Sequence, residues 1–287
     1  MKQIREGARG TQIIFFLMVC VFCAVLFAAA PGRIYDDWRI YRNAAQAIVH
    51  GEDLYTPNSG YFNPPWMALI LIPFSFFPYR IGAGLLSTAT LIVLLLISRR
   101  YDFSIFKTIL LVASPVSFYT IIHTQIDALV LAGVLLPAAW WPIAALSKPQ
   151  VALGLGFHVL QKEHIKSAVL IAAAVLTVSF LLFGFWPQDV LQTVSVADAP
   201  WNVWLNFWPR AFPLGVILAM LGMKYKDERL LLASSPFLLP YAAISSFLGP
   251  WVAAHTELED WQAGLIFLVG WVVFIIIDPG VCTACPL

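Results

Sequence analysis

The sequence predicts an all-α membrane protein, a polytopic transmembrane bundle of about eight to ten helices in one domain over residues 1–287. Of its 287 residues, 60% are hydrophobic and 11% are charged, whereas a soluble domain carries about a quarter charged residues. Apolar runs of about 17 to 25 residues, the length that crosses a bilayer as a helix, recur along the chain. The net charge of +1 also makes nucleic acid an unexpected partner.

The first expected span covers residues 11–30 and follows the basic residues Lys2, Arg5 and Arg9. Basic residues gather in cytoplasmic loops, so this cluster predicts a cytoplasmic N-terminus. The apolar stretch is longer than a usual signal-peptide core, and a proline follows Ala28-Ala29-Ala30. We therefore expect an uncleaved span in the cell (inner) membrane rather than a signal peptide.

A long outer loop, residues 31–80, is expected next. Within it, the pattern of residues 39–49 predicts a short amphipathic helix that ends at Gly51. Residues 66–77 form an apolar piece that is short for a span and closes at Pro78, which favours an interfacial or re-entrant segment.

Further spans are expected at 81–98, 105–122, 167–186, 210–223 and 262–277. Between Asp127 and Lys162 the apolar pieces are short, and we expect one full span plus a broken helical hairpin. Residues 230–254 predict either one long span or a hairpin broken at Pro236 and Pro240. The basic clusters expected on the cytoplasmic side are Arg99/Arg100/Lys107, Lys162/Lys166 and Lys224/Lys226/Arg229.

Two adjacent carboxylates, Asp36 and Asp37, open the polar stretch that follows the first apolar run. Ionisable groups next to hydrocarbon are costly and often mark function. We predict Asp37 as a catalytic base, with Asp36 second; the alternative is that the pair only caps the outer helix. Arg39 and Arg42 are candidate phosphate contacts, and interfacial anchoring is an equal alternative for them.

Lys148 is the strongest candidate cation. It lies in an apolar setting with no acid near it in the sequence, and a buried lysine without a partner tends to lose its charge. An anionic ligand such as a phosphate is therefore its natural complement, and snorkelling to the interface is the alternative. His123, Gln125 and Asp127 end one expected helix and begin the next, where helix capping is the alternative for Asp127.

Four motifs occur in order along residues 11–250. The first is the Asp37-Trp38-Arg39-Ile40-Tyr41 run with Ala44-Ala45, Gly51 to Tyr55 and Tyr61-Phe62-Asn63-Pro64-Pro65. The others are Pro115 with Gln125-Ile126-Asp127, then Leu146-Ser147-Lys148-Pro149-Gln150, then Ser235-Pro236-Phe237 with Tyr241. Together they resemble glycosyltransferase family 87, a GT-C type family of integral-membrane enzymes that use polyprenyl-phosphate sugars.

The resemblance implies a GT-C-like fold and transfer of a sugar, mannose or another hexose or pentose, to a lipid or glycan acceptor. The active face would be periplasmic or extracellular. It also implies that Tyr41, Gln125, Asp127, Gln150 and Tyr241 line the acceptor site or cavity. His123, close to Gln125, is a further candidate for this lining, and a packed or interfacial histidine is the alternative for it. We expect the donor lipid to enter a cavity that opens sideways to the membrane, and Asp37 and Lys148 to face that cavity together.

No metal or cofactor is expected. No His, Cys and Asp residues have metal-ligand spacing, and Cys282 and Cys285 form a single CxxC, which is weak evidence for metal or redox chemistry. The chain lacks a Walker loop and a GxGxxG motif, which disfavours a nucleotide-sugar donor.

The main alternative function is non-enzymatic: a transporter, flippase or accessory subunit with the same fold. Broken helices with polar residues at depth also occur in transporters, which place ionisable groups near the bilayer midplane in matched halves. Here those groups gather at one expected face and no internal repeat is visible, so the transferase is favoured.

Overall fold

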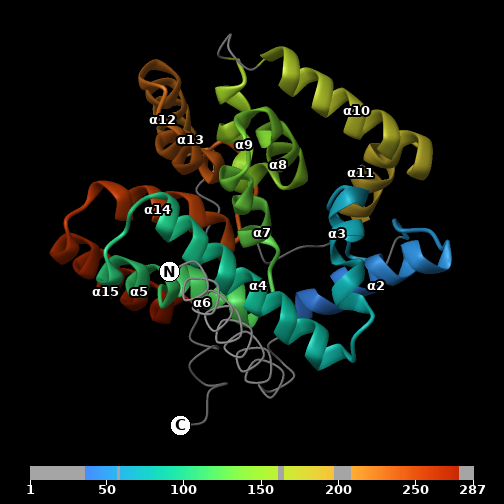
Figure 1. The fold of residues 1–287 in the computed structure, drawn as a ribbon, viewed down its shortest axis with the longest axis horizontal. Coiled ribbons are helices and arrows are strands. Elements are labelled where there is room, and N and C mark those ends of the chain that lie inside the picture. Colours follow the sequence, from blue (N-terminus) through green and yellow to red (C-terminus); the bar gives the residue numbers. More distant parts are fainter. Residues whose placement is uncertain (1–35, 57–58, 161–164, 197–207, 278–287) are drawn as a thin grey trace, which may run out of the picture.

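The computed structural model describes residues 36–56, 59–160, 165–196 and 208–277 (Figure 1). The expected first span, 11–30, and the two tail cysteines lie outside these residues. The regular elements of the described part are all helices, with no strands. Its first elements are α2 (Asp36–His50), α3 (Pro65–Ser75), α4 (Tyr79–Arg100), α5 (Ile105–Val112), α6 (Pro115–Ile122), α7 (Asp127–Leu131), η2 (Ala132–Leu135), η3 (Ala138–Trp140), α8 (Trp141–Ser147) and α9 (Pro149–His158).

The chain continues with α10 (Ile165–Phe183), α11 (Trp186–Val196), α12 (Phe212–Tyr225), α13 (Glu228–Ser234), η5 (Ser235–Phe237), η6 (Ile244–Phe247), α14 (Leu248–Glu257) and α15 (Asp260–Ile277). By length and composition, α4 and α10 can cross a membrane, and α5 with α6 make a third candidate if the bent pair is one span. An all-α protein compatible with a membrane is therefore confirmed. The larger bundle of eight to ten helices stays a prediction.

The break between α5 and α6 replaces the straight span expected at 105–122. Pro115 is the first residue of α6, where its missing N–H costs nothing, and the Ser114 hydroxyl accepts a hydrogen bond from the Ser117 N–H. This is the signature of a new helix start. The two helices consequently bend by 49° at this point.

The amphipathic helix expected at 39–49 is present as α2, and Gly51 follows it at φ 70°. Trp38 fixes α2 on the start of α4: its side chain is fully buried and its Nε1 donates to the Tyr79 carbonyl at 2.9 Å. The contact needs a glycine on α4, because a Cβ at Gly82 would lie 2.7 Å from the Trp38 ring. Figure 1 shows α2 and α3 together near the start of α4.

The full span expected between Asp127 and Lys162 is wrong for the residues that the structure describes there. Residues 127–158 form five short pieces, from α7 to α9. Prolines at 137, 142 and 149 interrupt the helical hydrogen bonding and keep each piece short. For residues 230–254 the broken alternative is confirmed, as α13, η5, η6 and α14.

Several charged residues join helix ends at the end of α4 that is remote from α2. Arg100 makes a bidentate ion pair with Glu228 at 2.9 and 3.0 Å, Arg229 pairs with Glu257, and Ser104 donates to Asp260 at 3.0 Å. Two of the basic clusters expected on one side of the membrane therefore meet at one end of the molecule. The acidic residues Glu257 and Asp260 lie at the same end.

Candidate functional site

A connected group of polar side chains forms from segments that are far apart in sequence. Asp37 and Tyr41, four residues apart, share one face of α2. Gln125 precedes α7, Asp127 begins α7, and Lys148 separates α8 from α9. We call Asp37, Tyr41, Gln125, Asp127 and Lys148 the polar cluster.

A tight turn after α6 aims Gln125 and Asp127 into the cluster. His123 caps α6, and Thr124 adopts a left-handed conformation at φ 54°, which is unusual for a β-branched residue. The Gln125 N–H then bonds back to the Thr120 carbonyl at 2.8 Å, and Asp127 starts the next helix two residues later. The turn therefore sets both side chains at the junction of the two helices.

Lys148 enters the cluster because the chain cannot remain helical at that residue. It precedes Pro149, and a residue before proline is disfavoured in the α region. Its backbone is extended at φ −154° and ψ 88°, it ends α8, and Pro149 begins α9. The Lys-Pro pair in the sequence thus accounts for the break locally.

Lys148 is paired with an acid, which corrects the expectation of a lysine without one. Its Nζ lies 2.5 Å from the Asp127 Oδ2, and the two side chains are 7% and 0% exposed. Asp127 is 21 residues away in sequence, so inspection of the neighbouring residues could not find it. The charge on Lys148 is balanced by the protein itself, and an anionic ligand is not needed for that purpose.

Gln125 bridges this ion pair to Asp37. Its Nε2 donates to the Asp37 Oδ2, and its Oε1 accepts from the Tyr41 hydroxyl at 3.1 Å and from the Lys148 Nζ at 3.3 Å. Asp37 and Lys148, 111 positions apart in the numbering, are thereby joined through one side chain. The predicted proximity of these two residues is present in the structure, and whether they share a ligand cavity stays a prediction.

The C-terminal half supplies the remaining wall of the cluster. The Ser246 hydroxyl donates to the Asp127 Oδ1 at 3.5 Å, and Tyr241 interacts electrostatically with Lys148, Asp127 and Asp37. Tyr241 was predicted at this site. Ser246 was missed, because a serine in the apolar run 242–254 gives no signal of its own before the fold is known.

The other predicted residues are not among those that the hydrogen bonds of the polar cluster join. Arg39 is exposed, and Arg42 donates along its own helix to Gln46 at 3.2 Å. The His123 ring stacks on Tyr119, with centroids 4.2 Å apart. Gln150 is buried on α9. Asp36 is the first residue of α2, and its side chain lies outside the described part of the structure.

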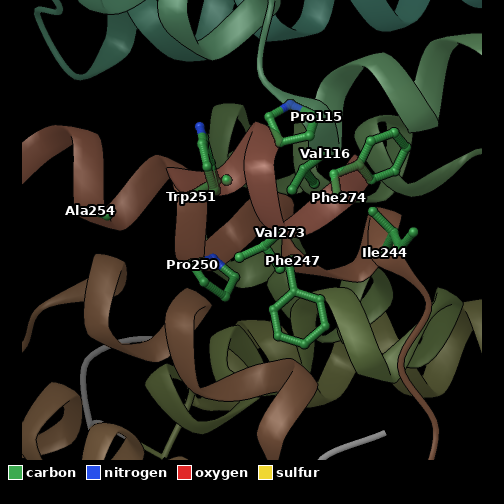
Figure 2. A pocket seen from close by; sticks show the side chains of 10 residues that line it. Pro115, Val116, Ile244, Phe247, Pro250, Trp251, Ala254, Val273 and Phe274 are labelled. Carbon is green, nitrogen blue, oxygen red and sulfur yellow. The ribbon is translucent and has the colours of Figure 1, made fainter. Parts of the chain in front are cut away.

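An apolar pocket of about 280 Å³ lies beside η6 (Figure 2). Its wall is made by residues of α6, η6, α14 and α15: Pro115, Val116, Ile244, Phe247, Pro250, Trp251, Ala254, Gly270, Val273 and Phe274. Phe247 directly follows Ser246, so the pocket and the polar cluster share η6. The pocket matches the apolar, aromatic character predicted for a lipid site, but Asp37 and Lys148 do not line it.

Among the residues that the structure describes, no group of three or more His, Cys, Asp or Glu side chains is arranged to hold a metal ion. Comparison with protein-family models, with curated proteins and with solved structures gives no match to this chain. The polar cluster and its surroundings therefore carry the functional argument alone.

Proposed function

We propose that the chain is a membrane glycosyltransferase that moves a sugar from a polyprenyl-phosphate donor to a lipid or glycan acceptor. The main observation that supports this proposal is the hydrogen-bonded link from Asp37 through Gln125 to Lys148. It puts a carboxylate and an ammonium at one site, beside a helix that packs on the start of the candidate span α4. A transferase of this kind needs both charges at the reacting carbon.

In the proposed reaction, the acceptor hydroxyl oxygen attacks the anomeric carbon of the donor sugar. The bond from that carbon to the phosphate oxygen breaks, the bonding electrons leave with the polyprenyl phosphate, and Asp37 accepts the hydroxyl proton. The attack comes from the face opposite the leaving group, so the configuration inverts. Asp37 lies in the first turn of α2, where the helix dipole favours a negative charge.

Lys148 would stabilise the departing phosphate. An ammonium has three N–H donors. In the part of the chain that the structure describes, the Lys148 ammonium donates to Asp127 and Gln125. The third donor can meet a phosphate oxygen while Asp127 keeps the ammonium charged. Charge-assisted bonds to developing phosphate charge are the usual means of stabilising such a leaving group.

The apolar pocket supports the lipid part of the proposal. Its wall holds side chains of mainly aromatic and aliphatic character (Figure 2), and α15, which forms one side, exposes Leu268, Val272 and Ile276 to the surroundings. Hydrocarbon is the natural solvent for such surfaces. A polyprenyl chain seated there would lie against η6, the element whose Ser246 donates to Asp127.

The test is transfer of labelled mannose from polyprenyl-phosphate mannose to membrane acceptors by the full-length chain. If Asp37 is the base, Asp37→Asn should lower transfer by roughly 10² to 10⁴-fold, and Lys148→Ala should weaken donor binding. Arg99→Gln is the matched control, because Arg99 is exposed at the end of α4 that is remote from α2. Transfer near the wild-type rate by Asp37→Asn would remove Asp37 as the base, and absence of transfer by the wild type over a panel of polyprenyl-phosphate sugars would reject the transferase.

The buried Asp127–Lys148 pair gives one reason to keep a transporter as second candidate. Ion pairs at the ends of broken helices also mark substrate or proton pathways. A transporter would move a labelled solute into proteoliposomes without forming a new glycosidic bond. Uptake without transfer would therefore select this function.

A further inference from the structure

We propose that Gln125 is the residue that positions the Asp37 carboxylate, and that the Asp127–Lys148 ion pair fixes the direction of the Gln125 amide; the inference rests on the proposed function. Gln125 itself does not touch the reacting atoms in this scheme. It acts through Asp37, and it is therefore a positioning residue rather than a catalytic one.

The direction of the amide follows from hydrogen-bond chemistry. A lysine ammonium can only donate, and an ionised carboxylate can only accept. Gln125 lies between Lys148 on one side and Asp37 on the other, so its oxygen must face the ammonium and its NH₂ group must face the carboxylate. The reverse orientation would place two acceptors together at Asp37 and two donors together at Lys148.

Burial makes this orientation a fixed one. Gln125 is 7% exposed and Tyr41 is 5% exposed, so water cannot easily replace a lost bond. The Tyr41 hydroxyl adds a second donor to the Gln125 oxygen at 3.1 Å. Buried polar networks with satisfied partners are rigid, and an unsatisfied member is costly.

The titratable and charged side chains that face this amide come from every neighbouring segment of the cluster. α2 supplies the carboxylate and the phenol of Asp37 and Tyr41. The junction of α8 and α9 supplies Lys148, α7 supplies Asp127, paired to Lys148, and Tyr241 interacts with these charges from the segment after η5. A charge introduced at position 125 would therefore act at contact distance on the Asp37 carboxylate and on the Lys148 ammonium.

The key variant is Gln125→Glu, which keeps the shape of the side chain and replaces the donor NH₂ with an acceptor. Two adjacent carboxylates disfavour ionisation of both. The readout is the pH dependence of Asp37 modification by dicyclohexylcarbodiimide, which reacts with protonated carboxyls, measured by peptide mass spectrometry on the full-length protein in detergent. The expected result is an upward shift of the labelling midpoint by about one pH unit or more.

Gln262→Glu is the matched control, because Gln262 accepts from the backbone N–H of Glu259 at the start of α15 and a carboxylate can do the same. It should leave the Asp37 labelling midpoint unchanged. An unchanged midpoint in Gln125→Glu, with the variant folded by its thermal transition, would overturn the proposal. This readout does not require transferase activity, so its failure is separate from failure of the proposed function.

The kinetics of sugar transfer provide a second, independent test of the positioning role of Gln125. Gln125→Asn is one methylene shorter and cannot hold both neighbours, so kcat should fall by about 10²-fold with little change in KM for the donor. If the wild type transfers sugar and Gln125→Asn retains its kcat, the positioning role is rejected while the transferase stands. If the labelling midpoint shifts but the wild type transfers nothing, Gln125 still orients Asp37, and the transferase alone fails.

Discussion

Removal of one member of the Asp127–Lys148 pair should destabilise the protein far more than removal of both. The two side chains are 0% and 7% exposed, so Asp127→Ala leaves a buried ammonium without its counter-charge. Loss of one partner of a buried pair costs about 3 to 5 kcal/mol, whereas an apolar replacement of both partners is often neutral or stabilising. We therefore expect Asp127→Leu/Lys148→Met to recover most of the free energy of unfolding that either single variant loses.

The assay is unfolding of the purified protein in detergent, followed by the fluorescence of its 11 tryptophans. The Arg100–Glu228 pair is the control, because its side chains are 36% and 21% exposed, and a pair of this exposure contributes about 0 to 1 kcal/mol. Glu228→Gln should therefore change stability little. The reasoning would be refuted if the Asp127/Lys148 double variant lost as much as the sum of the two single variants, because the two charges would then be energetically independent.

Two further predictions concern other parts of the fold. Gly154→Ala should destabilise the contact between α9 and α13 by about 1 to 3 kcal/mol, since the new Cβ would lie 1.7 Å from the Leu231 carbonyl oxygen. The control in the same unfolding assay is Gly264→Ala on α15, where the nearest neighbour of the new Cβ would be 3.6 Å away. Equal stability of the two variants would contradict the close packing at Gly154. Hydrogen bonding to Arg229 lowers the pKa of Asp227 in the folded protein. The ionised Asp227 therefore stabilises the folded state above the unfolded-state pKa of about 3.9, and this contribution is lost as the pH falls through the lower pKa of the folded state. Asp227→Asn should remove this part of the acid dependence, measured as the thermal transition temperature from pH 5 downward, and an unaltered profile would show that the pair does not contribute.

Local features of the sequence predict much of the chain's organisation. Long apolar runs gave α4 and α10, because a stretch of that length favours a membrane helix without help from distant residues. The spacing of Asp37 and Tyr41 on one helix follows from helical periodicity. The break at Lys148 follows from Pro149, whose ring acts on the residue directly before it.

Tertiary structure alone decided how these pieces meet. The Asp127–Lys148 pair depends on the left-handed turn at Thr124. A β-branched residue such as threonine rarely adopts this conformation, so the sequence does not predict the turn. Ser246 reaches Asp127 across 119 positions, and the bend between α5 and α6 gives α6 its own direction. Charge pairing and amide orientation are properties of side chains in contact, so they are fixed only when the fold brings the distant segments together.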